Sequence, residues 1–544
     1  MKLSSLSSRV LCPGLMLLAL ASTLHAQVQV WKSEYSAGGS TSKGVRIALS
    51  PDSSVVVAAT CDDITARRRL VLMKLSRDNG DTLWARYWSG DSACDSSRAE
   101  ALAVDDSGNV FVAGIIARGF DWNWVTFKYL PNGALAWAVP YDNGGFDRPY
   151  AILPDNRGGV YVAGTSNSAA GWLDALVVRY DPAGDSLWSF RLNGPGNGRD
   201  HLRALARGPN GSIYAAGNMY QSAEQDWDLL TIMLDSLGDT IWTRTYDGTS
   251  SGNPLIEGDV CFGIATDKTG NCYVTGKAGE AGEWLNAVAI KYTPDGTQAW
   301  RYSFDWGNAG SEVASHIELD SFGNVYVGGC VDEGDGWDML VYSLSQDSAP
   351  TLRWKRRFNY VNAGDDDSLT GMVADLSGNV YLTGLSNTTN LDLEWWTLKL
   401  SPQGDTIWSV TNGRLDTDNS PYGLVLDDRG DVYVTGYETP STSQPEQTVT
   451  IRYTENDVGV LRIAMPADSF RLGATVTPRA WVRNYGGMTE RSFTVRLDIG
   501  SLYTDAENVD SIPAFDSVLV RFAALRIEER ALGTHPMVCY TMLT

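Results

Sequence analysis

A short polar turn followed by an apolar run recurs along most of the chain. The clearest copies vary around the form Asp-x-x-Gly-Asn-Val-Tyr-Val-x-Gly, and their final glycines are Gly114, Gly164, Gly217, Gly276, Gly329, Gly384 and Gly436. Gly and Asn tolerate the positive φ that tight hairpin turns need, and apolar residues at successive positions predict a strand covered on both faces. With a degenerate first copy at 55–60, the chain holds eight units spaced by about 53 residues.

Each unit also predicts three further strands. A stretch such as 99–104 precedes the turn, a run such as 121–129 follows the apolar strand, and a second tight turn leads to a strand with a tryptophan. These fourth-strand tryptophans are Trp84, Trp137, Trp188, Trp242, Trp300, Trp354 and Trp408. Four-stranded units repeated radially form a β-propeller. We interpret the tryptophans as packing between blades, because a buried indole covers on the order of 150–250 Å².

The eighth unit lacks its fourth-strand tryptophan, since none follows the strand-like run 448–453 where the spacing requires one. An unmatched copy of that strand, carrying Trp31, precedes the first unit at 30–35. The pattern therefore predicts an all-β, eight-bladed propeller in which the N-terminal strand completes the last blade. Deletion of residues 27–40 is expected to destabilise the whole ring.

The repeated motif resembles the SBBP repeat of secreted bacterial β-propeller proteins, and the resemblance covers about residues 28–456. That family name refers to seven blades, so the resemblance leaves a seven-bladed ring as the alternative to the eight units counted. The Gly-Asp-x-x-Trp element is also similar to the tryptophan-docking repeats of eight-bladed quinoprotein dehydrogenases.

The two ends of the chain differ from the repeats. Residues 1–26 carry Lys2 and Arg9, then an apolar run and small residues, which predicts a secretory signal peptide cut before Gln27. The propeller is expected over 27–456. Short strand patterns then predict a small β-sandwich over 457–544. This segment resembles bacterial adhesion-related (CARDB-like) Ig-like modules, and we expect it to be truncated, with its last strand missing.

Charge and composition limit the partners. The formal net charge is −22, and loss of Lys2 and Arg9 with the leader makes it about −24, which disfavours nucleic acid as a partner. No apolar run approaches the roughly 20 residues of a spanning helix, so no membrane span is expected. His201, His316 and His535 lie far apart in the sequence, and no pair of Cys or His has zinc-binding spacing.

An acidic residue recurs eleven positions before the glycine of the first turn. These residues are Asp147, Asp200, Asp259, Glu312 and Asp367. If the first strand of each unit lines the axis, their carboxylates ring one mouth of the channel and offer calcium the six to eight oxygens that it binds. The alternative is that each carboxylate ties down its own loop by accepting backbone N–H bonds. No other cofactor is expected.

A second set of tryptophans recurs where the third strands begin, at the face that carries the long loops. They are Trp122, Trp172, Trp227, Trp284, Trp337 and Trp395. Acidic or amide neighbours accompany many of them, a combination that suits sugar or peptide binding on loops held by a rigid scaffold. Packing beneath the loops is the alternative.

His316 stands where other first strands carry Ala or Gly. Two interpretations are open for this side chain. It either lines the channel as a proton acceptor or ligand, or it fills a wider gap between blades.

Six cysteines remain after the predicted leader, in an export context that permits disulfides. Cys61 follows the second strand of the first unit, and Cys94 lies in the loop that leads into the second unit. Both should emerge on the same face, so they are the candidate disulfide, although sequence alone does not fix the connectivity.

These observations favour a secreted, extracellular or cell-envelope-associated binding protein that is not an enzyme. Its partner would be an extracellular glycan, peptide or protein of unknown identity. A polysaccharide-active or quinoprotein-like enzyme is one alternative, but acids that recur blade by blade lack the two distinct environments that acid–base catalysis needs. A structural matrix or surface-layer component is the other alternative.

Overall fold

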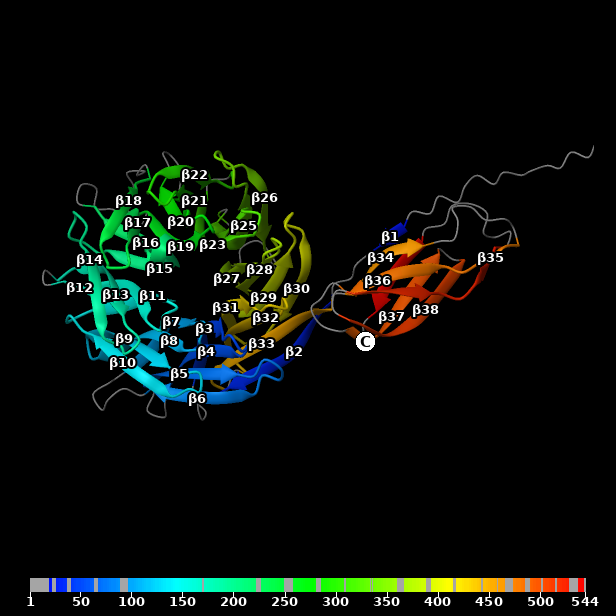
Figure 1. Cartoon of the computed structure of the whole chain (residues 1–544), viewed down its shortest axis with the longest axis horizontal. Helices are drawn as coiled ribbons and strands as arrows, with labels where there is room; N and C mark the ends of the chain where they lie inside the picture. Colours follow the sequence, from blue (N-terminus) through cyan, green and yellow to red (C-terminus); the bar gives the residue numbers. More distant parts are fainter. Residues whose placement is uncertain are drawn as a thin grey trace, which may run out of the picture. The chain divides into compact units, whose positions relative to one another are not determined.

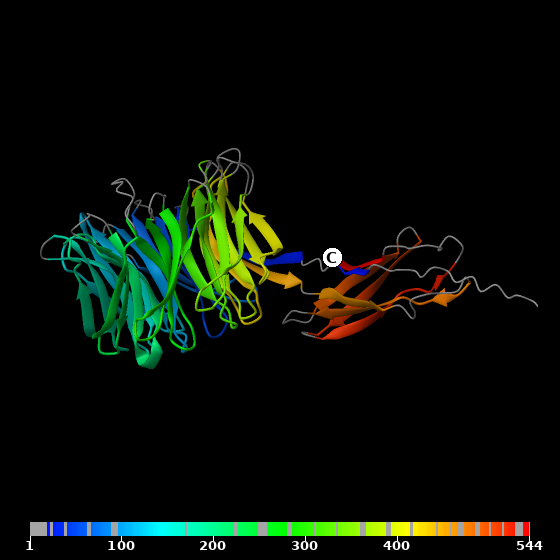
Figure 2. The same cartoon turned by 90° about the horizontal axis from the view of Figure 1, so that it is seen from above.

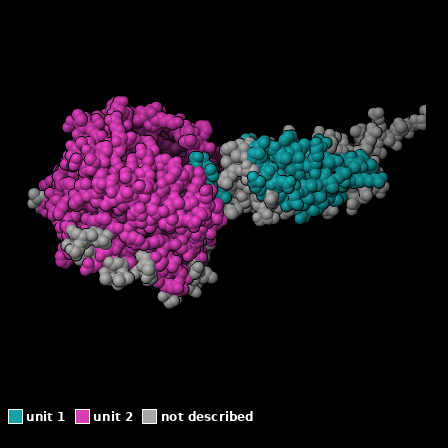
Figure 3. All heavy atoms as spheres, turned by 60° about the horizontal axis from the view of Figure 1, so that its bottom comes forward, with its two compact units in different colours: residues 1–28, 428–431, 453–544 teal, residues 29–427, 432–452 magenta. Residues whose placement is uncertain are grey.

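The computed structural model divides the chain into two compact units, each with its own apolar core. The larger unit comprises residues 29–427 and 432–452, and the smaller comprises 1–28, 428–431 and 453–544 (Figure 3). The described residues are 19–21, 26–36, 41–62, 67–88, 96–168, 171–221, 227–248, 258–279, 285–307, 310–332, 334, 336–359, 366–387, 393–413, 417–441, 444–456, 458–464, 473–484, 490–499, 502–513, 516–527 and 537–542.

The larger unit is a ring of eight four-stranded sheets, the blades (Figure 1), which confirms the predicted eight-bladed, all-β propeller. Blades one and two contain β3 (Ser42–Leu49), β4 (Val55–Asp62), β5 (Arg68–Leu75), β6 (Thr82–Trp88), β7 (Ser96–Val104), β8 (Val110–Arg118), β9 (Asp121–Tyr129) and β10 (Leu135–Tyr141). Blades three and four contain β11 (Asp147–Pro154), β12 (Val160–Asn167), β13 (Leu173–Tyr180), β14 (Ser186–Leu192), β15 (His201–Arg207), β16 (Ile213–Tyr220), β17 (Trp227–Leu234) and β18 (Thr240–Tyr246).

The remaining blades follow the same plan until the last one. Blades five and six contain β19 (Val260–Thr266), β20 (Cys272–Gly279), β21 (Leu285–Tyr292), β22 (Gln298–Phe304), β23 (Ser311–Leu319), β24 (Val325–Asp332), β25 (Trp337–Leu344) and β26 (Leu352–Phe358). Blade seven contains β27 (Asp367–Ala374), β28 (Val380–Asn387), β29 (Leu393–Leu400) and β30 (Thr406–Asn412). Blade eight joins β31 (Asn419–Leu426), β32 (Val432–Glu438) and β33 (Gln447–Asn456) to the N-terminal strand β2 (Ala26–Tyr35).

The turn motif of the sequence closes the hairpin between the first two strands of a blade. In blade two, Asp105 Oδ1 accepts the backbone N–H groups of Ser107 (2.9 Å) and Asn109 (2.8 Å), and Asn109 Nδ2 donates to Asp105 Oδ2 (2.8 Å). Gly108 between them has φ +79°. The same bonds form around Asp267, Asp320 and Asp375. The motif is therefore a local structure that its own side chains stabilise.

The tyrosine of the motif is tied to the same aspartate. The hydroxyls of Tyr273 and Tyr326 donate to Asp267 and Asp320 Oδ2, each at 3.0 Å, six residues back along the chain. Both rings are fully buried between blades. One carboxylate thus holds the turn and also orients an aromatic side chain of the core.

The first strand of each blade lies innermost and contacts the first strands of both neighbours, including β3 with β31 (Figure 1). Figure 2 shows the strands of each blade crossing the thickness of the ring side by side. The second strands are buried on both faces, as in β12, whereas outer strands such as β14 expose alternate residues. Apolar clusters join neighbouring blades, for example Val56 and Leu72 of blade one with Val112 and Phe127 of blade two.

The fourth-strand tryptophans dock each blade onto the next one. The Trp84 Nε1 donates to the carbonyl of Pro131 (3.1 Å), which lies in the β9–β10 turn of blade two. An added Cβ on Gly133 of that turn would lie 2.7 Å from the Trp84 ring, so the turn passes directly over the indole. The same hydrogen bond and glycine contact are made by Trp137, Trp188, Trp242 and Trp354. These contacts support the packing interpretation of the tryptophans.

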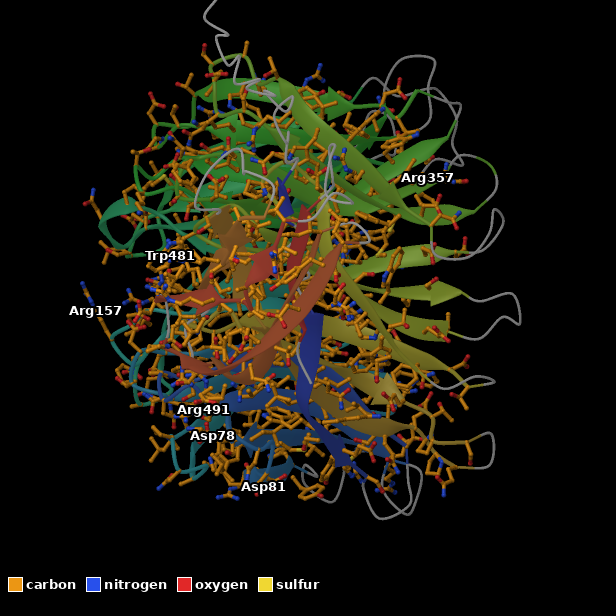
Figure 4. The ribbon with its side chains drawn as sticks, turned by 90° about the vertical axis from the view of Figure 1, so that its right-hand side faces the viewer. Asp78, Asp81, Arg157, Arg357, Trp481 and Arg491 are labelled. Atoms are coloured by element: carbon orange, nitrogen blue, oxygen red, sulfur yellow. The ribbon has the colours of Figure 1, made fainter. Side chains whose placement is uncertain are left out.

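Blade eight is closed by the strand that the sequence predicted for it. Trp31 Nε1 of β2 donates to the Arg77 carbonyl (2.7 Å), and the ring lies under Gly80 of blade one. Asp78 and Asp81, which are labelled in Figure 4, belong to this same turn between β5 and β6. The predicted ring closure is thus the ordinary blade-to-blade docking, made between two distant parts of the chain.

Two tryptophans depart from this scheme. The turn between β25 and β26, residues 345–351, has no glycine, and among the described residues the buried Trp300 Nε1 finds no hydrogen-bond partner. Trp408 of blade seven meets no such turn, because the outer strand of blade eight comes from the N-terminus. The docking contact therefore differs at the two junctions between blades five and six and between blades seven and eight.

The smaller unit consists of short sheets around one apolar core that includes Val482, Phe493 and Val495. Its strands are β34 (Val458–Ala464), β35 (Thr475–Val476), β36 (Arg479–Asn484), β37 (Glu490–Ile499), β38 (Tyr503–Ile512), β39 (Ser517–Arg521), β40 (Leu525–Arg526), β41 (Met537–Met542) and β1 (Ala19–Ala21). Their sheets have the orders β1-β41-β37-β38, β34-β36-β39 and β35-β40. Trp481 of β36 is labelled in Figure 4.

The strand β1 lies inside the segment expected to be a signal peptide. It pairs in parallel with β41, with Leu20 opposite Val538. Removal of the leader would therefore leave the outer edge of β41 open.

Helix is almost absent from the described residues, where a 3-10 turn at Pro209–Gly211 is the single helical element. In this part of the chain no helix has the length and apolar character needed to cross a membrane.

Candidate functional site

The repeated carboxylates lie at the starts of the first strands, and they hold the backbone of their own blades. Asp200 Oδ2 accepts the Gly194 N–H and Oδ1 accepts the Tyr220 N–H, both at 2.7 Å. Equivalent backbone N–H groups bond to Asp147, Asp259 and Glu312. Asp367 is buried at the corresponding position.

These contacts fit the interpretation in which each carboxylate anchors a loop. Burial raises the pKa of Asp147 and of Asp200, while the backbone N–H groups act in the opposite direction. Within the described residues, no group of three or more His, Cys, Asp or Glu is placed to hold a metal ion. The carboxylates are distributed around the ring and do not converge on one centre.

The third-strand tryptophans fall into different environments. Trp395 is buried and its Nε1 donates to the Tyr437 carbonyl (3.0 Å), and Trp227 Nε1 donates to the Arg199 carbonyl (2.7 Å). The backbone N–H of Trp337 donates to Asp366 (3.0 Å). Trp284 lies outside the described residues. Packing beneath the loops thus accounts for Trp395 and Trp227.

Trp122 and Trp172 are placed differently. The Trp122 ring stacks on Phe146 with centroids 5.5 Å apart, and the Arg98 guanidinium lies 5.1 Å from its centroid. Half of Trp172 is exposed to solvent. Trp122 and Trp172 lie beside the loops between blades two and four. The half-exposed ring of Trp172 remains available there to contact a ligand.

A β-bulge interrupts the first strand of every blade at the same position, next to the column of small residues. The extra residue differs from blade to blade: Val45, Glu100, Tyr150, Arg203, Phe262, Ser315, Thr370 and Tyr422. Bulges redirect a side chain and recur beside functional sites. This bulge column is the repeated position at which the blades differ most in side-chain chemistry.

Three successive members of the bulge column contact one another. The Arg203 guanidinium lies between Tyr150 and Phe262, at 5.3 and 5.6 Å from their centroids. Arg148 lies 4.9 Å from the Tyr150 centroid on the same strand. Cation–π contacts of this kind are favourable when partly desolvated. They link blades three, four and five along the channel.

A pocket of about 500 Å³ opens beside this stack, between blades three and four. It extends from Tyr150 on the channel side to the exposed Trp172 on the loop between β12 and β13. Its walls include Phe146, Tyr150, Asn167, Trp172, Arg199 and His201. Two isolated bridges, Trp122 with Phe146 and Leu173 with Arg199, join the third strand of each blade to the loop that enters the next one.

Positively charged arginine side chains act on one wall of the pocket, at His201. Burial together with the charges of Arg203, Arg199 and Arg148 lowers the pKa of His201 to about 3, so this imidazole is neutral at pH 7. The His201 ring meets Tyr150 edge to face at 5.8 Å. Its buried Nδ1 finds no hydrogen-bond partner among the described residues.

His316 lies across the ring from this pocket, on β23. Its Nδ1 is 2.7 Å from Ser315 Oγ, and burial together with the charge of Arg46 lowers its pKa to about 4. Arg46 occupies the corresponding small-residue position in blade one. Two large polar side chains therefore stand in the column of small residues, and the sequence pattern had singled out only His316.

The described residues do not test the candidate disulfide. Cys61 is buried at the end of β4, and Cys94 lies outside the described residues. The pairing of these two cysteines stays a prediction.

The pattern of the sequence did not identify Tyr150, Arg199, His201 or Arg203 as site residues. Attention to repeated residues selects those that build the fold, whereas Arg199, His201 and Arg203 are not repeated and Tyr150 is matched by Tyr422 of blade eight. Two features of the sequence could have found them. One is the variable residue immediately before the small residue of each first strand, and the other is the set of arginines between residues 148 and 203.

Comparison with known proteins supports the fold. A family model described as the SBBP beta-propeller repeat matches residues 353–392, which contain β27 and β28. No curated protein sequence matches the chain.

Three solved structures illustrate the similarity. The WD40 domain of SCAP from fission yeast has a TM-score of 0.43 and 10% identity, over 82% of this chain and 96% of that one. The propeller domain of the Trilobed protease from Pyrococcus furiosus has a TM-score of 0.38 and 10% identity, over 66% and 93%. Quinohemoprotein alcohol dehydrogenase from Comamonas testosteroni has a TM-score of 0.35 and 11% identity, over 78% and 76%.

Proposed function

We propose that this chain is a secreted or cell-surface binding protein, without catalytic activity, that recognises its ligand on the long-loop face of the propeller. The pocket between blades three and four carries the proposal. It is bounded by a half-exposed tryptophan, by the exposed Arg199 and by His201. Concave, partly aromatic pockets with a few polar groups are the usual form of small-ligand sites.

The rest of the repeat supports this assignment by exclusion. Fourth-strand tryptophans dock blades, motif aspartates close hairpins, and the loop carboxylates bind backbone N–H groups. These repeated residues are occupied in holding the ring together. Recognition is then left to the variable side chains, as is usual for loops on a rigid scaffold.

The test is a glycan and peptide array probed with the full chain. Saturable binding is expected, and Trp172→Ala should weaken it, because the indole supplies the exposed aromatic face. Arg157→Gln is the matched control. Arg157 is an exposed residue of the β11–β12 turn in the same blade, at the opposite end of the strands (Figure 4). Failure to bind any glycan or peptide would contradict the proposal.

A further inference from the structure

We infer that the pocket between blades three and four binds a carboxylate-bearing sugar, as found in an acidic extracellular glycan. This inference rests on the proposed function, since it names the ligand class of the same pocket. Its basis is the combination of guanidinium groups and aromatic faces around one cavity in an otherwise acidic protein.

The local charge is opposite to that of the whole chain. The net charge is −22, yet Arg148, Arg199 and Arg203 all act on His201 at the pocket wall. Arg199 is exposed at the mouth of the pocket. Planar guanidinium groups match the geometry of a carboxylate and can bind it in a bidentate manner.

The acidic groups nearby are engaged in ion pairs or in hydrogen bonds with backbone N–H groups. Glu100 pairs with Arg98 (2.6 Å) and Arg148 (3.0 Å). Asp174 pairs with Arg191 (3.0 Å), and the carboxylates of Asp147 and Asp200 accept backbone N–H bonds. None of these acids is among the residues that line the pocket in the described part of the chain. The exposed Arg199 is thus the pocket residue at which an anionic ligand would meet positive charge, because Arg148 is already paired with Glu100.

The aromatic side chains favour a sugar over an acidic peptide. Three aromatic residues line the cavity, and the half-exposed Trp172 offers its indole to a ligand, while the faces of Phe146 and Tyr150 are partly covered by Trp122 and by arginines. The Asn167 side chain adds an amide to the wall. Sugar rings stack on such faces, and their hydroxyls suit an amide. Extended peptides instead bind mostly by adding a strand to an open sheet edge, whereas the pocket is walled by side chains and loops.

A second cavity lies between blades one and two. It has a volume of about 250 Å³ and is lined by Arg67, Arg68, Arg98 and Trp122. Trp122 stacks on Phe146 of the first pocket, so one ring of this stacked pair lines each cavity. The pair of cavities suits neighbouring acidic residues of one oligosaccharide better than a single free acid.

Isothermal titration calorimetry of the full chain with a purified hexagalacturonate tests the inference. The neutral hexasaccharide of glucose and a short polyglutamate serve as comparison probes. Binding of the hexagalacturonate is expected to weaken at least tenfold from about 50 mM to about 500 mM salt, since charge screening acts on this contact. Neither comparison probe should bind measurably.

Single substitutions locate the site. Arg199→Gln and Trp172→Ala should each weaken hexagalacturonate binding about tenfold, and Arg199→Lys should retain part of it. Arg157→Gln, which removes an exposed arginine at the opposite end of the blade, should leave binding unchanged. All three positions are exposed or at the pocket mouth, and circular dichroism with thermal melting checks that the variants fold.

The outcomes separate this inference from the broader proposal. Equal binding of the neutral hexasaccharide, tight binding of polyglutamate, or hexagalacturonate binding indifferent to Arg199 and Trp172 overturns the acidic-sugar site. In those cases a ligand found on the array leaves the binding function standing. If no probe and no array feature binds the chain, both proposals fail.

Discussion

At the residue scale, an indole and a glycine form a matched pair at most blade junctions. Gly404 shows why both halves are needed. Its φ of +81° disfavours any residue with a Cβ, and an added Cβ would lie 2.6 Å from the Trp354 ring of the preceding blade. The glycine is thus required by the turn and, independently, by the close approach of a neighbouring side chain.

The substitution Gly404→Ala tests whether the close approach of the tryptophan constrains the turn in addition to its positive φ. Gly430 has nearly the same φ, +82°, but nothing lies within 4 Å of an added Cβ. Gly430→Ala should therefore cost about 1 kcal/mol from backbone strain alone, and Gly404→Ala should cost a further 1–3 kcal/mol or so from overpacking. Urea denaturation followed by tryptophan fluorescence measures the difference. Equal losses would show that the tryptophan does not constrain the turn.

A titratable residue inside the ring makes stability depend on pH. Burial raises the pKa of Glu318 on β23 to about 7. An unfolded glutamate titrates near pH 4.3, so between about pH 4.5 and pH 7 the folded chain retains a proton that the unfolded chain has lost. The contribution of Glu318 to stability should therefore fall as the pH rises through this window.

Glu318→Gln removes that titration. The variant should melt at a temperature close to that of the parent at about pH 5, and above the parent at about pH 8. The exposed Asp106→Asn serves as the control and should show no such pH-dependent gain. If the melting temperatures of the parent and of Glu318→Gln differ by the same amount at every pH in this range, the raised pKa of Glu318 is contradicted.

At the scale of elements, the strand β2 joins the ring by the same contacts that join most other outer strands to their neighbours. Trp31 supplies both an indole N–H for the Arg77 carbonyl and a ring under Gly80. Further contacts secure the junction of blades eight and one, including Ser42 Oγ with Thr448 Oγ1 (2.6 Å) and an ion pair between Lys43 and Glu446 (2.8 Å).

Two substitutions at Trp31 separate ring packing from hydrogen bonding. Trp31→Ala should destabilise the propeller by about 3–5 kcal/mol, because a large buried ring is lost. Trp31→Phe keeps an aromatic ring under Gly80 and loses the N–H bond, so about 1 kcal/mol is expected. Thermal melting and urea denaturation measure both. If Trp31→Ala melts like the parent, β2 does not close the ring.

The elements could be predicted because their determinants are local and repeated. Each unit carries its own sequence signature for the Asp105-type turn, the apolar second strand and the outer tryptophan. Because the eighth unit lacks that tryptophan, the sequence also predicted closure by Trp31. The candidate site could not be predicted in the same way. Tyr150, Arg203 and Phe262 meet across three blades through a bulge at one position, and no spacing within a single unit encodes that meeting.

At the scale of the whole molecule, repeated polar groups stabilise the ring, whereas non-repeated polar groups make some blades chemically different from the others. Backbone N–H groups bond to the loop carboxylates of Asp147, Asp200 and Glu312. The arginine and aromatic side chains of the two cavities instead belong to blades one to four, where they interrupt the symmetry of the ring.

This arrangement predicts the effect of removing divalent cations. Melting temperatures of the full chain with a chelator and with millimolar calcium are expected to agree within error, because backbone N–H groups bond to most of these carboxylates and the described residues hold no cluster of acids placed to bind a metal ion. A drop in melting temperature with the chelator, reversed by calcium, would instead favour a structural ion at the channel mouth.

The split construction of blade eight also decides how the ring responds to force. Figures 1 and 2 show the beginning of β2 beside the end of β33, so the two ends of the propeller segment leave the ring together. Tension applied through both ends would separate these strands one hydrogen bond at a time, as in unzipping, instead of loading all their bonds at once. The ring should consequently open at blade eight under a small force, while the seven blades made of continuous chain remain folded.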